Sequence, residues 1–119
     1  MISMINHYLG KAAEIIAKNY LLNKGHILVA RNYRCFLGEI DIILLKDTTL
    51  VVCEVKYRKN DYESAVAAIN INKQRKIKKT LEYFLLNNSY FKIYEIRFDV
   101  IIITGNILNY EINWLKNTF

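Results

Sequence analysis

The sequence contains no proline and only four glycines among its 119 residues. This scarcity excludes collagen-like and low-complexity chains, which depend on those two residues. Long apolar runs are also missing, because runs such as residues 42–45 and 100–103 fall far short of the roughly 20 residues that cross a bilayer. The N-terminus has no cationic start, and Asn6 and His7 interrupt the apolar stretch that a secretory signal requires. We therefore expect a cytoplasmic protein without a membrane span.

Cysteine and histidine are scarce as well. Cys35 and Cys53 can form at most one disulfide, and their separation matches no zinc-ligand spacing. The two histidines, His7 and His26, are isolated from each other and from both cysteines. We expect reduced thiols and no zinc site.

What the chain does have is apolar material and an excess of positive charge. Hydrophobic residues make up 53% of the sequence, including nine tyrosines and five phenylalanines, which is enough for the core of one domain over residues 1–119. Lysine and arginine number 17 against 11 acidic residues, a net charge of +6.

The excess charge lies in one segment. Residues 56–79 hold eight basic residues against two acidic ones, whereas the rest of the chain balances at nine against nine. A concentrated basic segment is typical of proteins that bind polyanions such as nucleic acid. The alternative is that a coding bias toward Lys, Asn, Ile and Tyr produced a solvated basic face with no partner.

Hydrophobic periodicity predicts an α/β fold with the element order αβββαββ. Asn6 is a candidate N-cap and Gly25 a candidate C-terminal stop for the first helix. The stretch 60–72 is irregular or begins the second helix, a Gly105–Asn106 turn separates the last two strands, and residues 114–119 form a tail. The expected helices cover residues 7–24 and 72–86, and the expected strands cover residues 26–34, 39–46, 50–58, 93–104 and 107–112. Helices flanking a central mixed sheet, with strands 50–58 and 93–104 parallel, is the economical packing.

Polar residues interrupt two strands that are otherwise apolar. With a hairpin loop of two or four residues, Asp41 lies opposite Glu54, and Glu39 lies opposite Lys56. Two carboxylates about 5 Å apart destabilise a sheet unless something compensates their charge. Mg²⁺ would do so, since it binds one or two carboxylates and keeps sites for phosphate oxygens. Lys56 would then orient a water or stabilise charge on a phosphate.

A structural alternative uses the same residues. Asp41 and Glu54 would neutralise Lys56 and Arg58 in an ion-pair cluster at the sheet edge, because such networks also occur without chemistry. The residues alone leave both interpretations open.

Several motifs in order resemble one known family. Glu14 in the first helix, the Gly38-Glu39-Ile40-Asp41 stretch and the Glu54-Val55-Lys56 stretch resemble the PD-(D/E)xK nucleases of restriction-endonuclease-like fold. The best match is the YraN-like family of bacterial proteins, which is similar to Holliday-junction resolvases. The resemblance extends over nearly the whole chain, from Gly10 to Phe119, although Gly38 and Glu39 stand where the motif name has proline.

The resemblance implies a metal-dependent endonuclease that hydrolyses phosphodiester bonds in branched or otherwise structured DNA. It implies that Asp41, Glu54 and Glu14 bind Mg²⁺ or Mn²⁺ and that Lys56 is the catalytic lysine. A junction has near two-fold symmetry, so its symmetric cleavage would favour a homodimer.

Other basic residues are candidates for DNA contact. Arg31 and Arg34 precede the acidic stretch and would contact phosphate, or would pair with Glu39. Arg58, Lys73 and Lys76 belong to the basic segment, and a basic helix face suits contacts to the phosphate backbone that carry no sequence information.

Two functions from other classes stay open. One is a nucleic-acid-binding protein that keeps the nuclease fold without turnover, and the other is a small structural protein with no nucleic-acid partner. Arg97 and Asp99 alternate with apolar residues and are expected to form a structural pair.

Overall fold

The computed structural model describes residues 2–119, and at residues 2, 3 and 5 it describes the backbone alone. Five strands form one mixed sheet in the order β1-β2-β3-β4-β5. The elements are α1 (Ile2–Asn23), β1 (Ile27–Cys35), β2 (Gly38–Lys46), β3 (Thr49–Arg58), α2 (Tyr62–Ala67), α3 (Ile71–Asn87), the 3₁₀ helix η1 (Ser89–Ile93), β4 (Glu95–Asn106) and β5 (Asn109–Leu115).

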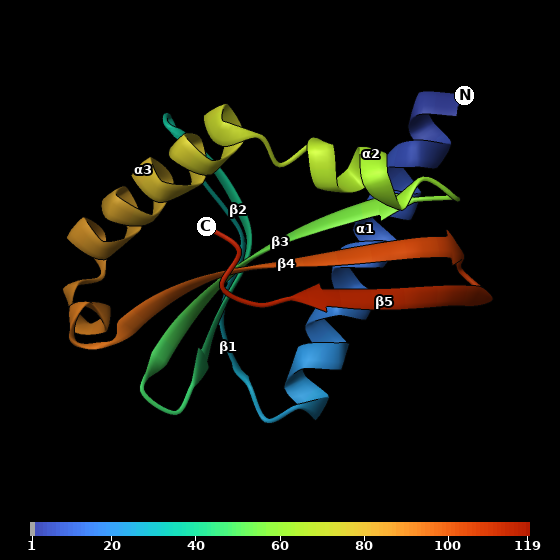
Figure 1. The fold of residues 1–119 in the computed structure, drawn as a ribbon. Coiled ribbons are helices and arrows are strands. Elements are labelled where there is room, and N and C mark those ends of the chain that lie inside the picture. Colours follow the sequence, from blue (N-terminus) through green and yellow to red (C-terminus); the bar gives the residue numbers. More distant parts are fainter. Residues whose placement is uncertain (1) are drawn as a thin grey trace.

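The helices lie on both faces of the sheet. Figure 1 shows α1 on one face and α2 with α3 on the other. β3 and β4 pair in parallel, as expected for two strands joined through helices, whereas the other neighbours are antiparallel. The α/β class and the central mixed sheet are therefore confirmed, and the short helix α2 is an addition to the expected order.

The first helix is longer than the sequence suggested. Asn6 is not its N-cap, because α1 already begins at Ile2 and nothing between the two residues breaks a helix. Its C-terminal end is as predicted. Gly25 has φ +89°, and the backbone N–H groups of Gly25 and His26 donate to the carbonyls of Leu22 and Leu21, the two bonds of a Schellman motif.

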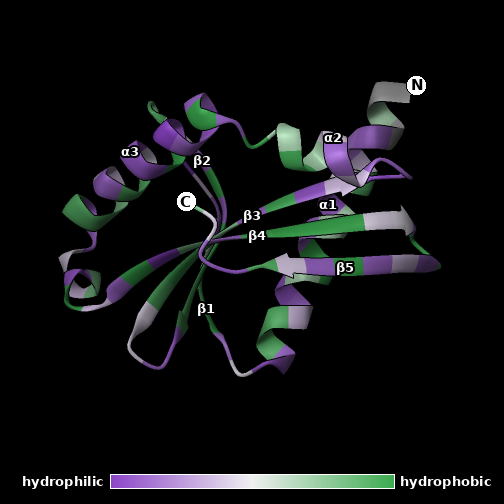
Figure 2. Ribbon diagram, viewed as in Figure 1, coloured by the Kyte–Doolittle hydropathy of each residue, from purple (hydrophilic) through white to green (hydrophobic). Residues whose placement is uncertain are grey.

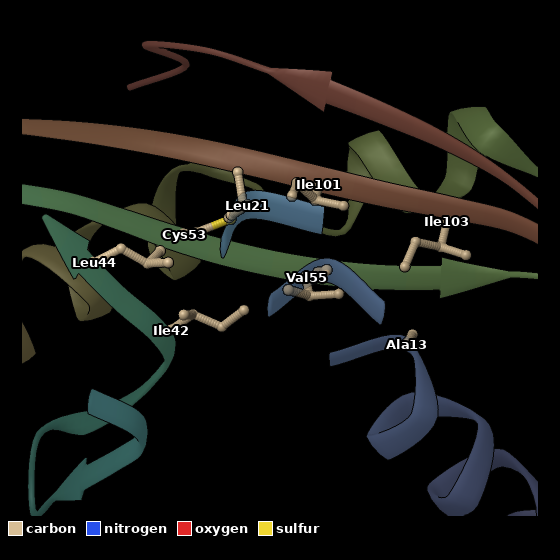
Figure 3. Packing of buried hydrophobic residues seen from close by; sticks show 9 residues of the cluster. Ala13, Leu21, Ile42, Leu44, Cys53, Val55, Ile101 and Ile103 are labelled. Atoms are coloured by element: carbon tan, nitrogen blue, oxygen red, sulfur yellow. The ribbon is translucent and has the colours of Figure 1, made fainter. Parts of the chain in front are cut away.

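The buried core under α1 comes from three strands. Ala13, Ala17 and Leu21 recur every four residues and face Ile42 and Ile101, among others. Figure 3 shows side chains of β2, β3 and β4 directed toward this helix. Figure 2 shows that the central sheet is hydrophobic in the middle of β4, whereas much of the covering helix α3 is hydrophilic.

The β2–β3 hairpin has the predicted register. Lys46 pairs with Thr49 and Ile42 with Cys53, around a two-residue loop in which Asp47 takes φ +54°. Asp tolerates this left-handed conformation, so the loop works without the Asn-Gly pair that hairpins favour.

The last hairpin is displaced from its predicted position. Gly105 and Asn106 belong to β4, and the turn passes through residues 107 and 108. The Asn106 Oδ1 atom accepts hydrogen bonds from the N–H groups of Leu108 and Asn109, at 3.0 and 2.8 Å. Trp114 lies in β5 rather than in a tail. No helix in the described part of the chain is long and apolar enough to cross a membrane.

Candidate active site

The two central strands separate where the predicted carboxylates begin. Regular pairing of β2 with β3 ends at Ile42 and Cys53, one step before Asp41 would pair with Glu54. There the Val55 N–H donates to Asp41 Oδ2 at 2.9 Å, so a side chain replaces the missing backbone partner. The Asp41 carboxyl therefore lies at the fork between the strands.

The alternation of β2 breaks at the same point. Ile40 packs in the cluster below α3 together with Ile43, whereas Ile42 packs below α1. Strict alternation would place Ile40 and Ile42 on one face. The strand opposite is also irregular, because Asn32 in β1 has φ +49°. The prediction that Glu39 lies opposite Lys56 is wrong, since β2 has already left β3 at that level.

Asp41 and Glu54 form a close carboxyl pair. Glu54 is buried, with 4% of its side chain exposed, and Asp41 is half-buried. Burial, together with the hydrogen bond and the negative charge of Glu54, raises the pKa of Asp41 from 3.8 to about 8. Near neutral pH the pair therefore holds a proton. This proton removes one of the two negative charges that would otherwise repel each other.

A lysine from α3 neutralises the remaining negative charge of the pair. Lys73 Nζ lies 3.2 Å from Glu54 Oε2. The helix N-cap places it there, because Asn70 Oδ1 accepts from the Lys73 N–H and so sets the first turn of α3 over β3. Burial is the largest single influence on the pKa of Lys73 and lowers it. The charge and hydrogen bond of Glu54, together with the negative charges of Asp41 and Glu39, outweigh burial, and the pKa is raised.

Sequence analysis assigned Lys73 to phosphate contact and missed its position beside Glu54. The ion-pair alternative also named the wrong partners. Arg58 donates to the Ser64 hydroxyl and to the Tyr57 carbonyl, and the described residues show no ion pair between Glu54 and Lys56. The sequence offered one indication of this position. Asn70 is a good N-cap for a helix that follows strand β3, and a helix starting there returns over the end of β3, where Glu54 lies.

Glu14 reaches the same region from α1. Its side chain is 14% exposed, and its Oε1 lies 3.6 Å from Lys11 Nζ. Burial and then the negative charge of Asp41 raise the pKa of Glu14. The structure therefore brings together three of the four predicted catalytic residues.

Lys56 lies apart from the carboxyl pair. It is half-buried and lines a cavity of about 670 Å³ between the N-terminal half of α1 and the end of β3. The cavity wall reaches Val55, whose N–H contacts Asp41. Lys56 is thus next to the site without pairing to it.

The donor set decides whether a divalent cation fits. The described residues contain no group of three or more His, Cys, Asp or Glu side chains arranged to hold a metal. Two carboxyls suffice for Mg²⁺, which usually keeps several waters. Glu54 Oε2 and Glu14 Oε1 are buried, and each faces a lysine ammonium, Lys73 at 3.2 Å and Lys11 at 3.6 Å. The carboxyl oxygens of Asp41 and Glu54 therefore suit a Mg²⁺ site in which water molecules complete the coordination, and they do not suit a site made of protein ligands alone.

The predicted DNA-contact residues differ in whether they are free to contact a phosphate. Arg34 Nε lies 3.2 Å from Glu39 Oε2, so Arg34 and Glu39 form the pair that was the alternative to phosphate contact. Arg31 and Lys76 are exposed, whereas Arg58 is held by the hydrogen bonds described above.

Arg97 and Asp99 form the expected structural pair. Asp99 is fully buried and accepts four hydrogen bonds of 2.9 Å, from Arg97 Nε and Nη2, Trp114 Nε1 and the Asn117 N–H. This carboxylate joins β4, β5 and the C-terminal residues and has no free position for a substrate.

Fold and site together define a small α/β protein with a carboxyl pair where two central strands separate. The model of the uncharacterised protein family UPF0102 matches residues 13–103. Similar proteins include a UPF0102 protein of Clostridium botulinum (strain 657 / Type Ba4), 42% identical over 117 residues, which are 96% of this chain and 95% of that protein. A UPF0102 protein of Saccharophagus degradans is 40% identical over 111 residues, covering 92% and 91% of the two chains. A third, from Lachnoclostridium phytofermentans, is 44% identical over 111 residues, with the same coverage. The chain belongs to the UPF0102 family, which is the YraN-like family.

Proposed function

We propose that this protein is a metal-dependent endonuclease of restriction-endonuclease-like fold that hydrolyses phosphodiester bonds in branched or otherwise structured DNA. The observation that carries the proposal is the pair of Asp41 and Glu54, with a pKa of about 8 for Asp41. Strongly shifted carboxyls beside a cavity are characteristic of functional sites, because folding alone gains nothing from them.

The residues divide the work of hydrolysis. Asp41 and Glu54 would hold Mg²⁺ or Mn²⁺, with Glu14 at the margin of the site. Bound there, the cation supplies Lewis-acid polarisation of a phosphate oxygen and a more acidic water. Lys56, at the cavity next to Val55, would stabilise negative charge that develops on the phosphate. The exposed Arg31 and Lys76 would attract the DNA backbone.

A direct cleavage assay tests the proposal. Labelled four-way junction, flap, single-stranded and duplex DNA are incubated with Mg²⁺ or Mn²⁺ and wild-type protein, Asp41→Asn or Lys56→Ala. We expect metal-dependent cleavage of a branched substrate and its loss in both variants. Asp47→Asn in the exposed hairpin loop and Lys92→Ala in η1 are matched controls that should cleave normally. Cleavage that survives both site variants would contradict the proposal.

A second candidate is a nucleic-acid-binding protein without turnover. It is favoured by one observation, namely that a proton and Lys73 already compensate the carboxyl pair. Metal-independent DNA binding that falls with salt, with no cleavage and no change in Asp41→Asn, would support this candidate over the nuclease.

A further inference from the structure

Neither backbone conformation nor close packing explains why residue 10 of α1 is a glycine. Gly25, Gly38 and Gly105 all have φ between +89° and +154°, and a Cβ at each would lie within 3 Å of another atom. Gly10 has neither property, because a Cβ added there would meet nothing within 4 Å. A glycine inside a helix costs about 0.5–1 kcal/mol relative to alanine. The missing side chain therefore needs another explanation.

Gly10 lines the cavity that contains Lys56. The cavity of about 670 Å³ is lined by residues of the N-terminal half of α1 and of the end of β3. Figure 1 shows where these two elements lie in the fold. Leu9 and Val55 give it an apolar wall, and Lys56 and Lys59 give it positive charge. Among the described residues, none of those that line it is acidic.

The size, the apolar wall and the positive charge of the cavity indicate which ligand it can hold. A cavity of this size takes a group as large as one nucleotide, and a base pair inside a duplex cannot enter it. Nucleotides combine apolar faces, which suit Leu9 and Val55, with a phosphate, which suits Lys56 and Lys59. Val55 also touches Asp41, so a strand seated here passes next to the carboxyl pair.

We propose that the groove between α1 and the end of β3 seats an unpaired nucleotide of a DNA strand, and that Gly10 leaves the room for it. The inference deepens the proposed function, on which it rests, by naming unpaired DNA as the feature that is recognised. Duplex regions would bind elsewhere, on the exposed basic residues.

Filling the groove tests the idea. Binding of a fluorescent single-stranded oligonucleotide, and of the same sequence as a blunt duplex, is measured by anisotropy without divalent metal, so that nothing is cut. We expect Gly10→Leu to lower affinity for the single strand by about tenfold and to leave duplex affinity within about twofold, since one seated base accounts for such a change. Asn19→Leu is the matched control, because Asn19 is an exposed residue of α1 outside the groove.

A second pair of variants keeps the test decisive if Gly10→Leu folds poorly. Gly10→Ala should fold at least as well as wild type and weaken single-strand binding less than leucine does. Lys59→Gln should weaken single-strand binding more than duplex binding. Unchanged single-strand affinity in Gly10→Leu and Lys59→Gln would overturn the inference and leave the nuclease proposal intact. Absence of any DNA binding by wild type at low salt would overturn both.

Discussion

The carboxyl pair makes Asp41→Asn a stabilising substitution. The unfolded chain releases the Asp41 proton near pH 3.8, whereas the folded protein keeps it until about pH 8. Because the folded-state pKa is raised, the stability that this carboxyl contributes is fully present below about pH 3.8 and is lost as pH rises to about 8. Asparagine has no such proton, and its amide can donate to Glu54 while its oxygen accepts from Val55.

The size of the effect follows from the shift. One pKa unit corresponds to about 1.4 kcal/mol, so the difference at pH 7 has an upper limit of about 4 kcal/mol. Relaxation of the pair lowers this figure, and we expect a gain of about 2 kcal/mol in the free energy of unfolding at pH 7. The gain should grow from pH 4 to pH 8, stay constant above pH 8 and vanish below pH 4.

Urea unfolding of wild type and Asp41→Asn at several pH values between about 4 and 9 measures the gain. Asp47→Asn removes one carboxylate at an exposed loop position and is the matched control. A destabilised Asp41→Asn variant, or a difference that is the same at pH 4.5 and pH 8, would show that the folded protein holds Asp41 ionised. In that case the description of the site as a proton-sharing pair is wrong.

Three further predictions concern the same structure. Lys73→Met leaves Glu54 buried without its cation and should lower the free energy of unfolding by about 1–3 kcal/mol at pH 8, and added Mg²⁺ should recover part of the loss in a urea titration. Asp99→Asn should cost about 2–4 kcal/mol, because its amide group would face donors; a loss below about 0.5 kcal/mol in the same assay would contradict the four-bond arrangement. Mn²⁺ affinity of the wild type should rise between pH 6 and pH 8 as Asp41 gives up its proton, and calorimetry in buffers of different ionisation enthalpy should detect that proton; an affinity that does not vary with pH would argue against it.

Local chemistry explains most of what sequence analysis predicted correctly. Gly25 is a helix stop because φ > 0 is cheap for glycine, and the hairpin register follows from the two-residue loop. The parallel pairing of β3 and β4 follows from the helices between them. The same register predicts that Asp41 lies next to Glu54, and the structure shows these two carboxyls interacting.

What was missed depends on interactions between elements distant in sequence. Lys73 is 19 residues from Glu54, and only the docking of α3 brings them together. The Ile107–Leu108 turn has no turn-forming residue of its own and relies on Asn106, which sequence analysis placed inside the turn instead. Trp114 belongs to β5, where it pairs with Ile101 of β4, and its indole donates to the buried carboxylate of Asp99.

The open edge of the sheet gives two arginines a second role. In the described part of the chain β1 pairs with β2 alone and so forms one edge of the sheet. Exposed sheet edges promote aggregation because another strand can pair with them. The left-handed residue Asn32 distorts this edge, and the exposed Arg31 and Arg34 charge it, next to Ile27 and Leu28, which are 66% and 38% exposed. Neutralising both arginines should therefore cause concentration-dependent self-association in the absence of any DNA. On this view the two arginines oppose pairing of this edge with a second copy of the chain.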